Sequence, residues 1–270
     1  MDGFVDIHSH LLPGIDDGPR DLAGSLDMAR AAAAAGTSVL AATPHLRADF
    51  PGVHVSEIAA QCEQIQAEIN AAGIELRVVV GAETSLGWAL EASDAELDLA
   101  TYGQRGSDLL IETPPDVSML EQLLFQVRAR GKRVTLAHPE RSGAFKNNSE
   151  PLARLSEQGV LLQVNAQALL APRRSTTRRL AEQLCRDGHA HVLASDGHRG
   201  REWRPVSELA AGVEALSEMV GPERALWMAR DAPAAIVAGA ELPAAPPLHG
   251  ARRGFWRRGK RSASAADFSR

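Results

Sequence analysis

The segment SMLEQLLFQVRARGKRVTLAHPER, residues 118–141, contains the unit from which the fold is built. Apolar residues recur at helical spacing up to Arg130, and Gly131 then supplies the positive φ at which helices commonly end. The apolar run Arg133–Ala137 follows as a strand, and His138 stands directly at its carboxyl end. The segment therefore predicts a helix, a glycine stop and a strand that finishes on a potential metal ligand.

The same order of helix, glycine and strand recurs along the chain. The predicted strands are Phe4–His8, Ser38–Thr43, Leu76–Gly81, Asp108–Glu112, Arg133–Ala137, Val160–Val164 and His191–Ser195. The helical patterns between them include Asp21–Ala35, Val55–Ala72, Ser118–Arg130, Glu150–Gln158 and Ser175–Asp187. Strands that alternate with helices form parallel sheets, so the fold class is α/β. Seven such units within one chain favour a closed barrel over an open sheet.

Two segments depart from this pattern. Residues Trp88–Arg105 do not form a clean unit, and we expect an irregular insertion there. After Gly239 a Pro/Ala linker leads into a basic stretch without apolar periodicity. We therefore expect one domain over residues 1–241 and a disordered basic tail over residues 242–270. The basic cluster of this tail is either solvated or in contact with acidic partners.

Composition and charge exclude several classes of protein. The 270 residues are 44% hydrophobic, a share typical of globular proteins and too high for a disordered chain. The formal net charge is −5, and because residues 251–270 hold seven Lys/Arg and one Asp, residues 1–250 carry −11. An acidic body argues against nucleic-acid binding. The chain shows neither a transmembrane-length apolar segment nor a secretory signal, so we expect a cytoplasmic protein.

Histidines and carboxylates gather where the predicted strands end. The sets are Asp6, His8 and His10; His45; Glu83; Glu112; His138 with Glu140 and Arg141; and Asp196 with His198. In parallel α/β barrels, side chains at the carboxyl ends of the strands converge on one face, where catalysis takes place. His8 and His10 alternate along one strand, so both side chains point to the same face. Asn165, at the end of another strand, either faces the site or closes a turn.

So many acidic and imidazole side chains in one place would repel and desolvate one another unless cations lay between them. We therefore predict a metal site at the strand ends. Imidazoles mixed with carboxylates favour manganese, iron or zinc over magnesium or calcium. The absence of cysteine from these positions argues against a closed structural zinc site.

Seven motifs, in the order DIHSH, GIDDGP, ATPH, GAE, IE, AHPER and SDGH, resemble the PHP (polymerase and histidinol phosphatase) superfamily. The pairing of GIDDGP with AHPER resembles most closely its CpsB/YwqE-type bacterial protein-tyrosine phosphatases. The resemblance covers about residues 3–240 and excludes the tail. It implies a distorted (β/α)7 TIM-like barrel, the PHP fold, with a trinuclear centre of divalent ions, manganese by precedent and iron or zinc as alternatives.

The resemblance also implies nine metal ligands, which fall into three groups: His8, His10 and Asp196; the bridging Glu83 with Glu112 and His138; and Asp17, His45 and His198. Asp16 is the alternative to Asp17. Asp6 is expected to orient the ligands from behind, as such carboxylates usually do.

The chemistry expected of such a centre needs no protein nucleophile. Closely spaced ions lower the pKa of a bridging water, and the resulting hydroxide attacks phosphorus in line. Thiol phosphatases use a Cys-x5-Arg motif, but the sixth residue after Cys62 is Glu68 and the sixth after Cys185 is His191. A thiol mechanism is therefore excluded.

Two arginines are expected to bind the phosphate group. Arg141 of AHPER is the first, because a guanidinium group binds phosphate through two hydrogen bonds. The family has a second arginine shortly after its SDxH motif. Arg204, which precedes Pro205, matches it best, and Arg199 and Arg201 are the alternatives.

The leading hypothesis is a metal-dependent phosphatase acting on phosphotyrosine in proteins. The resemblance implies that the substrate is the tail of a bacterial tyrosine kinase of capsule or exopolysaccharide biosynthesis. The alternatives are a small-molecule phosphatase similar to histidinol phosphatase and a PHP-type module that only binds a partner. A binding module should have lost ligands, whereas every motif position here holds a residue able to coordinate metal.

Overall fold

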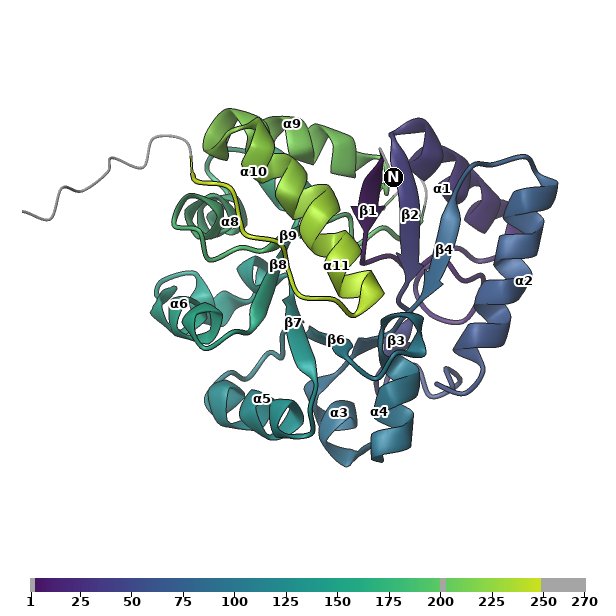
Figure 1. The fold of residues 1–270 in the computed structure, drawn as a ribbon, viewed down its shortest axis with the longest axis horizontal. Coiled ribbons are helices and arrows are strands. Elements are labelled where there is room, and N and C mark those ends of the chain that lie inside the picture. The colour runs from purple at the N-terminus through teal and green to yellow at the C-terminus, as the bar shows by residue number, and fades with distance from the viewer. Residues whose placement is uncertain (1–2, 200–202, 249–270) are drawn as a thin grey trace, which may run out of the picture.

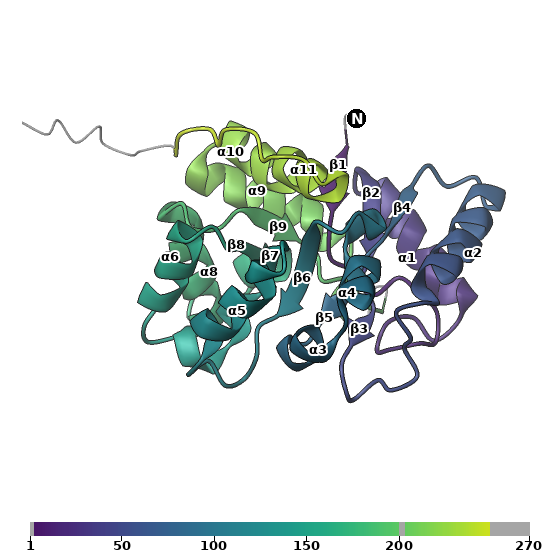
Figure 2. The same cartoon turned by 60° about the horizontal axis from the view of Figure 1, so that its bottom comes forward.

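Parallel strands alternate with helices through the residues that the computed structural model describes, 3–199 and 203–248 (Figures 1 and 2). The strands are β1 (Phe4–Asp6), β2 (Thr37–Ala42), β3 (His45–Leu46), β4 (Arg77–Val80), β5 (Glu83–Thr84), β6 (Asp108–Glu112), β7 (Arg133–Ala137), β8 (Leu161–Asn165) and β9 (Val192–Ala194). Each strand predicted from the sequence is present, with its ends shifted by two residues or fewer.

The longer helices are α1 (Leu22–Ala34), α2 (Ile58–Ala71), α5 (Leu120–Ala129), α6 (Glu150–Glu157), α8 (Thr176–Arg186) and α9 (Glu208–Val220). Shorter elements are α3 (Leu86–Glu91), α4 (Asp94–Ala100), α7 (Ala166–Leu170), α10 (Pro222–Leu226), α11 (Ala232–Ala238), the 3-10 turns η1 (Tyr102–Gln104), η2 (Pro139–Arg141) and η3 (Gly143–Phe145), and the π-helical η4 (Trp227–Asp231). The five predicted helices are all present. Gly131, at φ 80°, ends α5 as its position predicts.

The strands form two parallel sheets. One has the order β1-β2-β4 and the other the order β3-β5-β6-β7-β8-β9. β3 follows β2 and β5 follows β4 after two residues each, so the same two chain segments run through both sheets. Pro44 lies in the first of these breaks and has no N–H to continue the ladder. An isolated parallel bridge between Ser9 and Gly197 joins the segments that follow β1 and β9. The parallel α/β class is confirmed, whereas one continuous seven-stranded barrel is not.

The segment Trp88–Arg105 is regular, contrary to expectation. It contains most of α3, all of α4 and the turn η1. Ser93 and Glu96 form a reciprocal capping box at the start of α4, and this Ser-x-x-Glu motif can be recognised in the sequence. The buried Tyr102 then donates a hydrogen bond from its hydroxyl to the Ile7 carbonyl at 2.9 Å, which ties this segment to the strand leading into the site.

The chain after β9 covers one side of the sheets with α9, α10, η4 and α11 (Figure 1). Residues 242–248, assigned from the sequence to a disordered tail, lie against this layer. The carbonyl of Pro243 accepts a hydrogen bond from the Trp227 indole, and that of Pro246 accepts one from Arg224. The rest of the expected tail, 249–270, lies outside the described residues. In the part of the chain that is described, no helix combines the length and apolarity needed to cross a membrane.

Close packing of α9 on α7 gives a test of the fold. A Cβ atom added to Gly212 of α9 would stand 2.6 Å from the Cβ atom of Ala166. Alanine in a helix interior is otherwise better than glycine by roughly 0.5–1 kcal/mol. We expect Gly212→Ala to lower the free energy of unfolding by about 1–3 kcal/mol, because the overpacked helices must separate.

Urea unfolding measures this effect, with Gly87→Ala in α3 as the matched control. No atom lies within 4 Å of the Cβ position at Gly87, so this variant should be neutral or slightly stabilised. Equal stability of the two variants would contradict the packing described here.

Candidate metal centre

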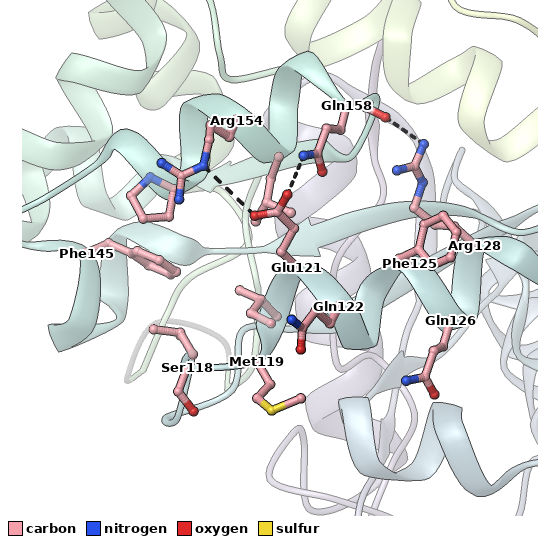
Figure 3. Close-up of a pocket in the computed structure, with 14 residues that line it drawn as sticks. Ser118, Met119, Glu121, Gln122, Phe125, Gln126, Arg128, Phe145, Arg154 and Gln158 are labelled. Atoms are coloured by element: carbon pink, nitrogen blue, oxygen red, sulfur yellow. Dashed lines mark hydrogen bonds and ion pairs between the residues drawn. The ribbon is translucent and has the colours of Figure 1, made fainter.

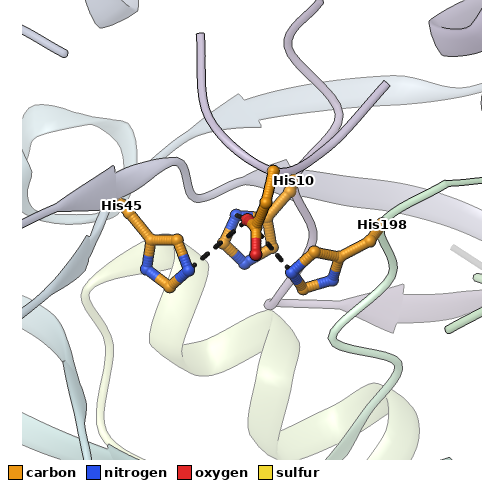
Figure 4. A group of neighbouring side chains, drawn as sticks. His10, His45 and His198 are labelled. Carbon is orange, nitrogen blue, oxygen red and sulfur yellow. Dashed lines mark ion pairs between the residues drawn. The ribbon is translucent and has the colours of Figure 1, made fainter. Parts of the chain in front are cut away.

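The nine residues that the resemblance implies as ligands come together in one cluster, formed by the carboxyl ends of β1, β6, β7 and β9, the first residues of β3 and β5, and the loop that carries Asp17. Their nitrogen and oxygen atoms form four overlapping groups, and the atoms of each group lie within 4.8 Å of one another. These groups are His10, Asp17, His45 and His198; His8, His10 and Asp196; His8, Glu83 and His138; and His45, Glu83 and Glu112. Figure 4 shows how His10, His45 and His198 turn toward a common point. Their role as ligands remains a prediction, but their convergence is a property of the fold.

His8 and His10 each hold one ring nitrogen in a hydrogen bond and direct the other into the cluster. Nδ1 of His10 lies 2.7 Å from Oδ2 of Asp16, and Nδ1 of His8 lies 2.9 Å from Oε1 of Gln163. The two Nε2 atoms are buried without hydrogen bonds, at 3.4 and 3.3 Å from the same Oε2 atom of Glu83. Both rings are therefore oriented to offer Nε2 to an ion.

Glu83 lies at the middle of the cluster. Its Oε2 atom is 3.0 Å from Nδ1 of His45, and its Oε1 atom is 2.9 Å from Nε2 of His138. The carboxylate therefore faces four imidazoles from three chain segments, since His8 and His10 both follow β1. Such a position between imidazoles is the one expected of a carboxylate that bridges ions.

The structure separates the roles of Asp16 and Asp17. Both oxygens of Asp16 are used, one by the amide of Gly18 and the other by the His10 ring and the amide of His45. Oδ1 of Asp17 is buried without a hydrogen bond, 3.3 Å from Nε2 of His198 and 3.6 Å from Nε2 of His45. This geometry favours Asp17 as the ligand and Asp16 as the residue that orients His10.

Glu112 is engaged by a residue that the sequence analysis missed. Both of its oxygens accept hydrogen bonds from Nη1 of Arg47, at 3.0 and 2.9 Å. Arg47 also pairs with Asp49, and it follows His45 of the ATPH motif by two residues. Each oxygen keeps a further lone pair, so Glu112 can serve as a ligand while Arg47 orients it.

Backbone strain occurs after two of these strands and in the loop that carries Arg204. His138, Asp196 and Arg204 are non-glycine residues with positive φ, at 37°, 52° and 48°. His138 precedes Pro139, a position at which extended backbone is normally preferred. Residues held in such regions cost about 1–3 kcal/mol each and tend to cluster at functional sites. Here the turn at each position helps to aim a polar side chain into the cluster.

The charges of the cluster are strongly coupled. Burial would raise the pKa of Glu83 and of Asp196, but the facing His8 ring holds both well below their ordinary values. Burial would likewise lower the pKa of His10, but the Asp16 carboxylate raises it well above the usual value. The buried carboxylates are therefore ionised, which is the form that binds cations.

Asp196 divides its two oxygens between different tasks. Oδ1 is buried without a hydrogen bond, 3.4 Å from Nε2 of His8. Oδ2 accepts hydrogen bonds from Arg204 at 2.9 Å, Arg141 at 3.0 Å and the side-chain amide of Asn165 at 2.8 Å. Both predicted phosphate-binding arginines therefore reach the edge of the cluster. Of the alternatives, Arg199 instead hydrogen-bonds the Asp17 carbonyl, and Arg201 lies outside the described residues.

A second layer of buried polar groups supports the cluster. Oδ1 of Asp6 accepts hydrogen bonds from the amides of His8 and Ser195, so this carboxylate joins the two strand ends as expected. Gln163 and Glu140 have supporting contacts that the sequence analysis did not predict. Gln163 could have been found, because it alternates with Leu162 and Val164 inside an apolar run and therefore points to the opposite face.

The cysteines lie apart from this chemistry. Cys62 and Cys185 are buried, and burial raises the pKa of each thiol to about 12. A thiol held protonated in this way is a poor nucleophile. The structure thus agrees with the exclusion of a thiol mechanism.

Two surface grooves differ in their relation to the cluster. A groove of about 1060 Å³ between α5 and α6 is lined by Phe125, Arg154 and neighbours, away from the ligand set (Figure 3). A second groove, of about 760 Å³, is lined by Glu112, His138 and Arg141 and so opens onto the cluster. The second groove is the smaller of the two, but its lining residues identify it as the access to the cluster.

The residues present fit divalent cations. Six buried nitrogen or oxygen atoms of the cluster make no hydrogen bond: Nε2 of His8 and of His10, Nδ1 of His45, Oδ1 of Asp17, Oε2 of Glu83 and Oδ1 of Asp196. Buried polar atoms are nearly always satisfied, so such a concentration points to ions as their partners. Imidazole and carboxylate donors together suit manganese, iron or zinc.

Comparison with known proteins agrees with this geometry. The family described as capsular polysaccharide synthesis, CpsB/CapC, matches residues 4–238. The tyrosine-protein phosphatase YwqE of Bacillus subtilis is 32% identical over 200 residues, which cover 72% of this chain and 77% of that protein. The tyrosine-protein phosphatase CpsB of Streptococcus pneumoniae is 24% identical over 244 residues, covering 87% and 98%.

Solved structures extend the likeness to the fold. A crystal structure from the pair YwqE of B. subtilis and CpsB of S. pneumoniae, described as unique metal-dependent tyrosine phosphatases, matches with a TM-score of 0.78 and 26% identity, over 90% of this chain and 98% of that one. A β-aspartyl dipeptidase from Fervidobacterium islandicum matches with a TM-score of 0.56 at 11% identity, over 87% of this chain and 75% of that one. The second likeness concerns the fold alone.

The different contacts of Asp16 and Asp17 lead to a test of the ligand set. We expect Asp17→Asn to bind fewer equivalents of Mn²⁺, because it loses an anionic ligand atom. Asp16→Asn should keep the number of equivalents at saturation but bind them about 10–100-fold more weakly, the usual cost of losing an outer partner of a ligand. Equilibrium dialysis with metal analysis measures both quantities. The assignment is reversed if Asp16→Asn loses an equivalent and Asp17→Asn does not.

Proposed function

The chain belongs to the CpsB/CapC family of capsular polysaccharide synthesis, and on this basis we propose that it is a metal-dependent phosphatase that hydrolyses phosphotyrosine in proteins. One observation carries the proposal: nine histidine and carboxylate side chains and two arginines converge on one cluster among the parallel strands. The relatives named tyrosine-protein phosphatases, YwqE and CpsB, support the class of substrate.

The proposed centre holds three divalent ions, with manganese as the favoured metal. His8, His10 and Asp196 would hold the first ion, and Glu83 would bridge it to a second held also by Glu112 and His138. Asp17, His45 and His198 would hold the third. When bound, the metals supply Lewis-acid charge and an activated water for attack on phosphorus. The grouping of His8, His10 and Asp196, and that of Asp17, His45 and His198, support the first and third sets, and Glu83 shares one group with His138 and another with Glu112.

Arg141 and Arg204 are proposed to bind the oxygens of the phosphate group. Each donates to Oδ2 of Asp196 through one nitrogen, Nη1, so other guanidinium donors remain for a substrate. The side chain of Arg141 is 39% exposed and that of Arg204 is 14% exposed, which places Arg141 at the rim and Arg204 deeper. A phosphate on the cluster would meet both, and their charge would balance that developing on its oxygens.

The groove that leads to the cluster supports a substrate carried on a protein. Arg47 and Arg141 line it together with Leu86, Pro114 and Pro115, which offer an apolar wall to an aromatic ring. We propose that the tail of a bacterial tyrosine kinase of capsule or exopolysaccharide biosynthesis is the physiological substrate. The family and the names of the relatives support this partner.

Phosphate release tests the function. After EDTA treatment, the chain should release no phosphate from a phosphotyrosine peptide, and added Mn²⁺ should restore release. His138→Ala should lose more activity than the roughly 10–100-fold typical of an outer partner, because a ligand itself is removed. The exposed His54→Ala serves as the matched control and should keep full activity. Release from histidinol phosphate alone would favour the small-molecule alternative, and no metal-dependent release from either would reject a phosphatase.

Arg141→Ala isolates the phosphate contact. We expect kcat/KM for the phosphotyrosine peptide to fall about 10–100-fold, equivalent to roughly 1.5–3 kcal/mol for a lost charged hydrogen bond. Bound Mn²⁺ should be unchanged, because Asn165 still donates to Asp196. The exposed Arg173→Ala is the control. Unchanged kcat/KM in Arg141→Ala would remove this residue from the phosphate site.

A further inference from the structure

A line of hydrogen bonds behind the cluster connects two of the proposed ligands. The side-chain amide of Asn165 donates from Nδ2 to Oδ2 of Asp196 at 2.8 Å. Oδ1 of Asn165 accepts from Nε2 of Gln163 at 2.7 Å, and Oε1 of Gln163 lies 2.9 Å from Nδ1 of His8. All four side chains are buried, so water does not compete for these contacts. We call Gln163 and Asn165 the amide relay.

The direction of each hydrogen bond in the relay follows from its Asp196 end. A carboxylate that already accepts from Arg141 and Arg204 can only accept, so Asn165 must present its NH₂ group there. The carbonyl of Asn165 then faces Gln163, whose NH₂ group must donate to it. The carbonyl of Gln163 is left to face His8, and this carbonyl has no proton to give.

His8 must therefore donate to the relay. A neutral imidazole has one N–H group and one lone pair, so a proton on Nδ1 leaves the lone pair on Nε2. Nε2 is the atom that makes no hydrogen bond and lies within 3.4 Å of both Glu83 and Asp196. The relay thus selects the tautomer in which His8 can bind an ion at the cluster.

We propose that Gln163 and Asn165 are positioning residues that fix the Nδ1–H tautomer of His8 and the orientation of Asp196 for metal binding. This inference rests on the proposed function, in that it assigns two further residues to the same centre. Neither amide touches the substrate or the reacting atoms. Each acts through a ligand, in the way that partners of metal-bound histidines usually do.

The relay also stabilises Asp196 during binding of a phosphate group. Arg141 and Arg204, two of the three donors to Oδ2 of Asp196, would share their guanidinium groups with a bound phosphate. Asn165 remains as a neutral donor that a phosphate does not attract, and it keeps Oδ1 directed at the cluster. The backbone N–H of Asn165 donates to Oε1 of the buried Glu140 at 3.0 Å, which fixes the backbone from which this side chain projects.

The first test is the tautomer of His8 in the metal-free wild-type chain. Nitrogen-15 NMR of the histidine rings at alkaline pH, where the rings are neutral, distinguishes protonated from unprotonated ring nitrogens. We expect His8 to carry its proton on Nδ1. In Asn165→Leu the direct partner Gln163 is intact but free to turn its amide, so His8 should become a mixture of both tautomers. A proton on Nε2 in the wild type, or an unchanged tautomer in Asn165→Leu, would overturn the proposal.

The second test is metal affinity, which does not depend on any phosphatase activity. Gln163→Leu should bind Mn²⁺ at one of its sites about 10–100-fold less tightly than the wild type, as measured by calorimetric titration. Thr135→Val is the matched control, because Thr135 is buried in the neighbouring strand β7 and its hydroxyl makes no hydrogen bond. Equal affinity in Gln163→Leu and Thr135→Val would reject the relay even if the enzyme proved to be a phosphatase. A lowered affinity would support the relay even if phosphotyrosine proved not to be the substrate.

Discussion

Buried nitrogen and oxygen atoms that make no hydrogen bond are the constraint on which this structure depends. Six of them, from His8, His10, Asp17, His45, Glu83 and Asp196, meet in the cluster. An unsatisfied buried polar group costs about 1–3 kcal/mol, and a charged one costs more. No chain that only had to fold would collect these costs in one place. Three surrounding features orient these atoms for binding to cations. They are the strained turns at His138 and Asp196, the Asp16 carboxylate and the amide relay.

The supporting contacts show a consistent division of labour within each side chain. The Nδ1 atom of His8 and that of His10 are bound from behind, and the Nε2 atoms face forward. Asp196 uses Oδ2 for three donors and leaves Oδ1 for the cluster. Binding one atom fixes the direction of the other, because both belong to a rigid planar group. Precise placement of the ligands therefore comes from residues that would never be ligands themselves, such as Gln163.

The sequence predicted which side chains converge better than it predicted the residues that support them. Motifs that end strands on histidine or carboxylate identify His138 and Asp196 directly, since parallel strands bring their carboxyl ends to one edge. Glycine stops such as Gly131 likewise defined the helices. The pairing of Arg47 with Glu112 depends on loop geometry between segments 65 residues apart, which no local pattern encodes. The choice between Asp16 and Asp17 could not be made either, because adjacent carboxylates differ only in the partners that the folded loop supplies. The prediction of an irregular segment at Trp88–Arg105 was wrong because its short helices have too few turns to show apolar periodicity. The capping residue Ser93 was nevertheless recognisable in the sequence.

Protons and divalent cations compete for the same groups in this centre. The carboxylates of Glu83 and Asp196 can be balanced either by imidazolium protons or by metal charge. Burial would lower the pKa of His8 and of His10, but the facing carboxylates raise both, that of His10 through Asp16 above all. A cation that binds Nε2 of either ring must displace one of these protons. The same carboxylates attract the metal ion and the protons that it must displace. The affinity for metal therefore rises with pH until both rings are neutral. The hydrogen bonds from Nδ1 of His8 to Gln163 and of His10 to Asp16 decide which proton leaves, because each secures the Nδ1 proton and leaves the one on Nε2 to be exchanged for the ion.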